Sequence, residues 1–336
     1  MTAPLALTMG EPAGIGGEIT LKAWRERVTS AIPPFFTIDD PARLTALART
    51  IGIDVPAREI DDPGEAERVF PDALPVLAQV LPRPPIPGRP DPANAPAVIA
   101  AIERAVALVR SQRANAVVTN PIQKETLYDS GFAYPGHTEF LGALAHVVHP
   151  VMMLAGPELR VVPVTIHLSL ADALAALSTT AIVTCGRVTA AALARDFGIG
   201  RPRLAVAALN PHAGEAGTMG YEEHDIIAPA VAALAAQGID VSGPAPADTL
   251  FHAAARTRYD AVLCMYHDQA LIPLKTLDFE RGINITLGLP FVRTSPDHGT
   301  ALDIAGRGIA NPASLIAALT AAGAMAARRA AQPTEA

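Results

Sequence analysis

The stretch Val161-Val162-Pro163-Val164-Thr165-Ile166-His167 is an apolar run of strand length that ends in a histidine. The same pattern returns in Leu204-Ala205-Val206-Ala207-Ala208-Leu209-Asn210-Pro211-His212 and in Ala261-Val262-Leu263-Cys264-Met265-Tyr266-His267. Runs this short and this apolar are typical of buried strands. We therefore expect each histidine at the carboxyl end of a strand, which is the edge where open α/β sheets bind their ligands.

Strand-like and helix-like segments alternate along most of the 336 residues. We expect further strands at Leu5–Met9 and Ala116–Thr119, and helices at Ile15–Arg25, at Pro41–Ala48 with Asp40 as its cap, at Ala95–Arg113, Ser169–Leu177, Val188–Phe197 and Asp225–Gln237, and from Pro312 onward. This alternation predicts an α/β fold with a mostly parallel sheet. Gly156-Pro157-Glu158 separates two apolar runs and predicts a hairpin, so part of the sheet is expected to be antiparallel.

Length and composition limit the class of protein. A chain of 336 residues exceeds what one core usually supports, so two domains are expected. The formal net charge is −7 and no stripe of Lys and Arg is visible, which argues against a nucleic-acid binder. Cys185 and Cys264 form no Cys-x-x-Cys pair and are expected to be buried thiols. Without a visible signal peptide or a run of about 20 apolar residues, we expect a soluble cytoplasmic protein with no membrane span.

The three histidines at the predicted strand ends are the strongest chemical signal in the chain. Neutral imidazoles that converge on one edge can hold a divalent metal, and such a site suits zinc or cobalt. Their spacing is long-range, so the pattern alone leaves open whether His167, His212 and His267 form a metal site or are unrelated. Asp268 is either an orienting partner of His267 or the cap of the next turn.

Two further segments combine a helix start with groups that suit an anion. Gly10-Glu11-Pro12-Ala13-Gly14-Ile15-Gly16 follows a predicted strand and opens a helix, so its backbone N–H groups either hold an anion or form a tight turn. It lacks the Gly-x-Gly-x-x-Gly dinucleotide fingerprint. In Gly136-His137-Thr138-Glu139 we expect Thr138 to cap a helix, with His137 at the helix start, where phosphate or carboxylate is favoured. The alternative there is a plain cap.

The remaining candidates lie in the last third of the chain. Lys275, Asn284 and Arg293 are basic and amide groups suited to a carboxylate or a phosphate, whereas Arg281 is expected to be ordinary surface charge. Asp248 is either a helix cap or a general base. Thr294–Gly306 is polar and glycine-rich, which favours a ligand-binding loop, and the proline-rich Leu81–Asp91 is expected to be an exposed loop.

Taken together, these segments resemble the 4-hydroxythreonine-4-phosphate dehydrogenase family, NAD-dependent enzymes of pyridoxal phosphate biosynthesis. The resemblance runs essentially end to end, and its most specific motifs contain His137, His212, His267 and His298 together with the N-terminal glycine turn. One departure is Gly17, because the family usually has a proline before Glu18.

The resemblance implies roles for these residues. His167, His212 and His267 bind one divalent metal (zinc, cobalt or magnesium); His137, Thr138, Lys275, Asn284 and Arg293 bind the phosphorylated substrate; Asp248 or Lys275 is the base; and Gly10, Gly14, Gly16, His298, Gly299 and Asp303 bind NAD, with NADP possible. It also implies a homodimer in which His267 reaches the metal of the partner subunit. The implied fold has two α/β/α domains like those of isocitrate and isopropylmalate dehydrogenases, formed by residues 1–133 with 286–336 and by residues 134–285.

The implied reaction is the oxidation of 4-phosphooxy-L-threonine at its C3 hydroxyl. The resulting β-keto acid would lose CO2 and give 3-amino-2-oxopropyl phosphate. Three alternatives remain open at this point. A related dehydrogenase would act on 4-phospho-D-threonate or D-erythronate, or on a cis-dihydrodiol of an aromatic acid. An acyltransferase related to phosphate acetyltransferase would need neither metal nor NAD. A zinc hydrolase would use water at the open metal position.

Overall fold

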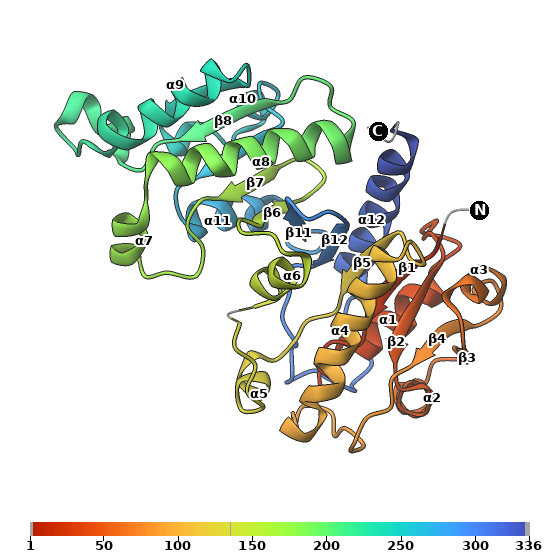
Figure 1. Ribbon diagram of the computed structural model, residues 1–336. Helices are drawn as coiled ribbons and strands as arrows, with labels where there is room; N and C mark the ends of the chain where they lie inside the picture. Colours follow the sequence, from red (N-terminus) through yellow and green to blue (C-terminus); the bar gives the residue numbers. More distant parts are fainter. Residues whose placement is uncertain (1–2, 135, 333–336) are drawn as a thin grey trace. The chain divides into compact units, whose positions relative to one another are not determined.

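The computed structural model describes residues 3–134 and 136–332 and divides the chain into two compact units (Figure 1). Unit 1 comprises Met1–Val148 and Leu289–Ala331, and unit 2 is formed by His149–Gly288. The predicted boundaries after residues 133 and 285 differ from these. The first boundary lies later because the helix of residues 137–145 packs on the core of unit 1, to which its Phe140 and Leu141 belong.

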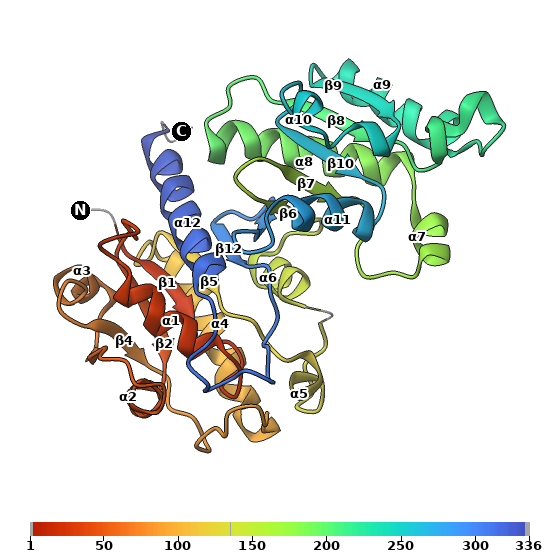
Figure 2. The ribbon, with the colours of Figure 1, turned by 180° about the vertical axis from the view of Figure 1, so that it is seen from behind.

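The sheet of unit 1 is entirely parallel. Its strands run in the order β3 (Ala57–Ile60), β4 (Leu74–Ala78), β2 (Phe35–Asp39), β1 (Leu5–Thr8), β5 (Ala116–Thr119) and β12 (Val292–Pro296). The helices are α1 (Gly16–Arg25), α2 (Pro41–Thr50), α3 (Ala66–Val69), α4 (Ala95–Arg110), α5 (Lys124–Tyr128), α6 (His137–Ala145) and α12 (Ala313–Ala331). Helix α4 covers one face of the sheet, and α1 and α12 cover the other (Figures 1 and 2). Strands β1, β2 and β5 are fully buried because they are covered on both sides.

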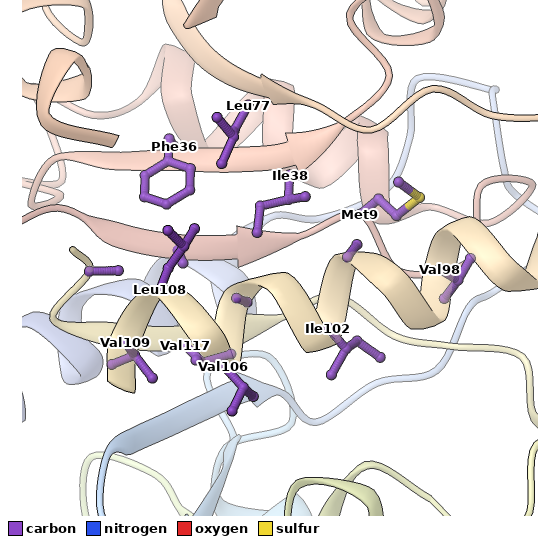
Figure 3. Close-up of a cluster of buried hydrophobic side chains, with 14 of the residues drawn as sticks. Met9, Phe36, Ile38, Leu77, Val98, Ile102, Val106, Leu108, Val109 and Val117 are labelled. Atoms are coloured by element: carbon purple, nitrogen blue, oxygen red, sulfur yellow. The ribbon is translucent and has the colours of Figure 1, made fainter. Parts of the chain in front are cut away.

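The core of unit 1 lies between the sheet and α4. Figure 3 shows Phe36 and Ile38 of β2, Leu77 of β4 and Ile102 of α4 within one buried cluster. Phe36 and Ile38 are completely buried, and each such side chain stabilises the fold by about 1.5–3 kcal/mol. This packing fixes the carboxyl ends of β1, β2 and β5, where the loops of the candidate site begin.

The sheet of unit 2 is mixed. Its strands run in the order β11 (Ile283–Leu287), β6 (Val151–Ala155), β7 (Arg160–Pro163), β10 (Ala261–Cys264), β8 (Arg203–Ala207) and β9 (Asp240–Ala245). Strand β6 is antiparallel to β11 and β7, and the remaining neighbours are parallel. The predicted hairpin is confirmed, and Gly156 N–H closes it by donating to Leu159 O at 2.9 Å.

The helices of unit 2 are α7 (Leu170–Ala176), α8 (Thr179–Phe197), α9 (Ala228–Ala236), α10 (Ala253–Arg256) and α11 (His267–Leu277). Helix α8 begins earlier than the predicted Val188, because Ser178 caps it by accepting from Ala181 N–H at 3.2 Å. Figure 1 shows α8 lying along the strands of this unit.

Strands β2, β3, β4, β9, β11 and β12 are absent from our sequence-based assignment. The α/β class with a mostly parallel, partly antiparallel sheet is nevertheless confirmed.

One helix among the described residues is long and apolar enough to cross a membrane. It is the segment Pro92–Arg110, which includes α4 and has a mean hydropathy of 1.3. More than half of it, 56%, is buried inside the protein, as expected for a core helix. Helices α7 and α8 pass the same test only as a pair, and they are bent by 87°.

Candidate functional site

The strand-end prediction for the three histidines is confirmed by the topology of unit 2. Strand β10 lies between β7 and β8 and is parallel to both, so the segments that follow these strands leave the sheet at the same edge. His167 follows β7, His212 follows β8, and His267 is the first residue of α11 after β10.

His167 and His267 lie close together within one chain. Their ring centroids are 6.0 Å apart, with 43° between the ring planes. Thr165 holds the two segments together beyond the sheet, since its Oγ1 donates to Met265 O at 2.7 Å. Both imidazoles line a hollow of about 280 Å³ that Leu168, Leu170, Tyr266 and Asp268 also help to form.

His267 has the partner that a metal-binding histidine usually has. Its Nδ1 lies 2.7 Å from Asp268 Oδ1. In the tautomer that donates this hydrogen bond, the lone pair is on Nε2, which is then free to bind a ligand. Asp268 is therefore placed as an orienting group for His267.

His212 does not join the other two histidines. It is exposed and begins a run of six residues with positive φ, His212 to Gly217, of which only Gly214 and Gly217 are glycines. Glu223 anchors the start of this loop, because its Oε1 accepts from Leu209 N–H and Asn210 N–H at 2.8 and 2.7 Å. Within residues 3–134 and 136–332 no group of three or more His, Cys, Asp or Glu side chains could hold a metal. One chain thus brings together two of the three predicted ligands.

A buried glutamine joins the two parallel strands that precede His212 and His267. Gln269 donates from Nε2 to Ala208 O at 2.7 Å and accepts at Oε1 from Met265 N–H at 2.7 Å. Only 8% of Gln269 is exposed, so both bonds are protected from water. Its amide therefore ties the carboxyl ends of β8 and β10 to each other.

In unit 1, half-buried His137 lies close enough to the buried guanidinium of Arg293 to feel its charge. Arg293 is 2% exposed and donates from Nη2 to Thr119 Oγ1 at 2.6 Å. Burial lowers its pKa to about 9, while Glu139 acts in the opposite direction. Burial, followed by the charges of Arg293 and Lys124, lowers the pKa of His137 well below its ordinary value, so this imidazole is neutral. Its Nε2 is buried without a hydrogen-bond partner, which indicates a place for a ligand atom.

Two predictions around His137 need correction. The cap of α6 is Gly136, in extended backbone and without a side-chain hydrogen bond, so Thr138 lies inside the first turn and does not cap the helix. Lys124 was missed, although it closely follows β5 and its charge reaches His137. The signal that could have identified Lys124 is its position beyond the carboxyl end of a strand.

The other predicted residues lie in unit 2 and are more exposed. Asp248 lies inside the short turn Ala247–Thr249, whose cap is Pro246, and α10 is capped by His252, so the helix-cap interpretation of Asp248 is wrong. Its role as a general base stays a prediction. Lys275 lies in the last turn of α11 with Nζ 5.7 Å from the centre of the Phe279 ring. Asn284 lies in β11 opposite Leu154. Arg281 pairs with Asp278 at 2.6 Å on the surface, as predicted.

The N-terminal turn and the C-terminal loop meet in unit 1. Ile15 N–H donates to Thr300 O at 3.0 Å, and a Cβ on Gly14 would lie 2.9 Å from the same oxygen. Gly10 has φ +68°, and a Cβ there would lie 2.6 Å from Pro121 O. The N–H groups of Glu11, Ala13, Gly14 and Ile15 donate within the protein. The tight-turn interpretation therefore holds for this part of the turn, and the glycines permit close packing.

Beside this turn lies a cavity of about 340 Å³. It is lined by Pro12, Gly14, Asp40, Ala42, Arg43, Ala46, Leu47, Thr50, Leu81, Pro84, Pro85, Pro87 and Gly306. The proline-rich loop is largely exposed, as predicted, but it also forms one wall of this cavity. Helix α2 forms another wall that the sequence did not indicate. His298, on the C-terminal loop, has a buried Nε2 without a hydrogen-bond partner, whereas Asp303 is exposed.

These features define a class. The protein is an α/β protein of two units, each with polar groups at the carboxyl ends of parallel strands, where this fold class binds its ligands. Residues 32–322 match the family described as pyridoxal phosphate biosynthetic protein PdxA, and the chain belongs to this family.

Individual relatives are similar to this chain over nearly its whole length. The chain is 58% identical to the 4-hydroxythreonine-4-phosphate dehydrogenase of Caulobacter vibrioides, over 97% of this chain and 98% of the relative. It resembles the crystal structure of the enzyme of that name from Klebsiella pneumoniae, with a TM-score of 0.87, 40% identity and coverage of 96% and 99%. A terephthalate 1,2-cis-dihydrodiol dehydrogenase from Burkholderia xenovorans is more distant, with a TM-score of 0.64, 30% identity and coverage of 96% and 98%.

Proposed function

We propose that this protein is a 4-hydroxythreonine-4-phosphate dehydrogenase. It would use NAD to oxidise the C3 hydroxyl of 4-phosphooxy-L-threonine, and the resulting β-keto acid would lose CO2 to give 3-amino-2-oxopropyl phosphate. The observation that carries the proposal is the group that buried Arg293 forms with Thr119 and half-buried His137 in a chain whose relatives bear this name. A buried guanidinium is suited to bidentate binding of a phosphate.

The phosphate would be bound by groups that unit 1 already holds in place. Arg293 is fixed by Thr119, and neutral His137 donates or accepts without adding charge. Lys124 supplies a positive charge nearby, and the first turn of α6 adds the positive end of a helix dipole. Burial strengthens these interactions, because water does not screen them. This part of the proposal favours a phosphorylated substrate over a cis-dihydrodiol.

The residues of unit 2 suit a divalent metal in part. His167 and His267 are close enough to share one ion through metal–nitrogen bonds of ~2.1 Å, and Asp268 orients His267. His212 would be the third ligand. A bound zinc, cobalt or magnesium ion would act as a Lewis acid toward the substrate's alcohol. The histidine side chains would hold the ion in position, and Asp248 or Lys275 would take the proton from that alcohol.

A homodimer is part of this proposal. Unit 2 exposes large apolar side chains at Leu168, Leu170, Leu174, Met219, Tyr221, Ile272, Leu277 and Phe279. Phe279 is 75% exposed and Leu170 is 70% exposed, and such side chains are typical of surfaces that a partner covers. A second copy would also complete the ligand set that one chain leaves incomplete: because His267 lies beside His167 within one chain, the ligand that the set lacks is His212, and not His267 as the resemblance implied. This interface would exclude water from the hollow beside His167.

The test is a turnover assay that follows NADH formation. We expect activity with 4-phosphooxy-L-threonine and NAD, and loss of this activity in the presence of a chelator. The comparison substrates are 4-phospho-D-threonate, 4-phospho-D-erythronate and the cis-dihydrodiol of terephthalate. Faster NADH formation with any of these would replace the proposed substrate, and activity that survives metal removal would contradict the metal assignment.

A further inference from the structure

The loop that carries His212 is fixed at its start by one buried carboxylate. Glu223 is only 6% exposed. Its Oε1 accepts from the backbone N–H groups of Leu209 and Asn210 at 2.8 and 2.7 Å, and its Oε2 accepts from Asn210 Nδ2 at 2.9 Å. Three donors thus meet one charged acceptor, and hydrogen bonds to a charged group are roughly twice as strong as those between neutral groups.

The same carboxylate also lies against the middle of the loop. A Cβ at Gly214 would lie 2.7 Å from Glu223 Oε2, which is closer than real Cβ atoms approach their neighbours. The glycine therefore lets the backbone come close to the carboxylate. His212 lies between the two points of contact, after Asn210 and before Gly214, so Glu223 holds the backbone on both sides of the histidine.

The backbone around His212 needs this support. The residues of the loop that have a Cβ and a positive φ, with φ between +41° and +54°, are His212, Ala213, Glu215 and Ala216. Residues with a Cβ rarely adopt this left-handed region, because the Cβ then lies too close to the backbone. Such conformations persist only when the surrounding structure fixes them, and they are concentrated at functional sites. Without its contacts to Glu223, the loop should relax and carry the imidazole of His212 to another position.

The turn that carries Glu223 is itself held by the body of unit 2. It is a π-helical turn, Glu223–Ile227, that continues directly into α9. Thr179, the first residue of α8, donates from Oγ1 to Ile226 O at 2.9 Å, and Ile227 is completely buried. Single π-helical turns are rare and occur frequently at functional sites. Glu223 is therefore fixed independently of the loop that it holds.

We propose that Glu223 is a positioning residue for metal binding. By fixing the loop on both sides of His212, it places this imidazole where it can join His167 and His267 of a second copy around one ion. Glu223 touches neither the ion nor the substrate and acts only through His212. This inference rests on the proposed function for the presence of the metal, and it adds the group that determines where the third ligand lies.

The test is a titration of the metal-free full chain with Co²⁺, followed by the visible absorption of the bound ion, which depends on the number and arrangement of its ligands. Glu223→Gln keeps the size of the side chain but offers one acceptor atom where the carboxylate offers two. We expect this variant to raise the Kd of Co²⁺ about tenfold, as the loss of a group that orients a metal ligand does, and to change the absorption of the bound ion.

A second variant and a combined variant separate positioning from a general loss of structure. Gly214→Ala keeps every polar group, but its Cβ pushes the carboxylate away from the loop, so it should weaken Co²⁺ binding in the same way. In His212→Ala protein, Glu223→Gln should cause no further rise in the Kd of Co²⁺, because Glu223 acts only through His212. Unfolding curves will show that all variants fold.

Glu158→Gln is the matched control, because Glu158 is an exposed carboxylate of unit 2 that pairs with Arg256. It should bind Co²⁺ like the wild type. Unchanged Co²⁺ binding in both Glu223→Gln and Gly214→Ala, or an equal effect of Glu223→Gln with and without His212, would overturn the inference. NADH formation that a chelator abolishes would still support the proposed function in that case. If the wild type binds no Co²⁺, the metal part of the proposed function fails, and the inference fails with it.

Discussion

The proposed phosphate-binding arginine of unit 1 is buried and fixed by its own chain, whereas the predicted metal ligands of unit 2 are exposed or half-buried and form an incomplete set. Arg293 is 2% exposed and tied to Thr119, but His212 lies in an exposed loop apart from His167 and His267. Burial and a hydrogen-bond partner hold a binding group in place before the ligand arrives, which reduces the cost of binding. We therefore expect the proposed phosphate site of unit 1 to be preformed by folding, whereas the proposed metal site of unit 2 would be completed by a metal and a second copy.

The largest expected effect comes from removing a predicted metal ligand. His212→Ala should abolish metal-dependent turnover, with a loss greater than the ~10–100-fold that changes around a metal's ligands cost. The fold should persist, because His212 is exposed. NADH formation and metal content are the measurements. His224→Ala, which replaces another exposed imidazole of unit 2, is the control. Full activity in metal-stripped His212→Ala protein would refute the metal assignment.

The second-largest expected effect comes from removing Arg293, the proposed phosphate-binding residue. Arg293→Ala should raise KM for the phosphorylated substrate by ~10- to 100-fold, the loss of hydrogen bonds to a charged group. KM for an unphosphorylated analogue should change far less. Arg281→Ala, which removes a surface arginine paired with Asp278, should leave both values unchanged. An equal rise for both substrates would rule out phosphate recognition by Arg293.

Asp268→Asn should have a smaller effect, because it changes only the partner of His267 Nδ1. We expect a decrease of about tenfold in metal affinity, measured by titration of the metal-free protein, with little change in thermal stability. Asp225→Asn, next to exposed His224, is the matched control. If metal affinity is the same in Asp268→Asn and the wild type, Asp268 does not orient a metal ligand.

The smallest effect is a pH dependence in unit 1. Because burial and the neighbouring positive charges lower the pKa of His137, the unfolded chain takes up a proton below pH ~6.5 that folded His137 does not. Unfolding is therefore favoured as the pH falls. Between pH 7 and 5 the wild type should lose ~1–2 kcal/mol more stability than His137→Asn in chemical denaturation. Parallel curves for the wild type and His137→Asn would contradict the neutral state of His137.

The sequence predicted the strand ends but not how the loops beyond them fold. Apolar runs identify β7, β8 and β10 because strands that are buried on both faces consist almost entirely of apolar residues. The loop of His212 is different, since its positive φ angles lie at alanine and glutamate positions that give no local signal. Thr138 is a residue type that often caps helices, yet the extended backbone at Gly136 starts the helix two residues earlier.

The cavity of unit 1 was missed for a related reason. Its walls come from α2, from the proline-rich loop and from the loop containing Gly306, which are far apart in the sequence. In the sequence, Arg43 and Asp40 are recognisable only as parts of a helix and its cap. Strand β2, which we did not predict, places them beside the glycine turn. Only tertiary packing gives these side chains their surroundings.

Gln269 has a consequence for how the chain reaches this arrangement. Its Oε1 can only accept and its Nε2 can only donate, and the two ends meet Met265 N–H and Ala208 O. A slip of one residue in either strand would exchange a donor for an acceptor at one end and leave two buried groups of the same kind facing each other. The amide thus disfavours shifted alignments of β8 and β10, because each would leave a buried polar group unpaired.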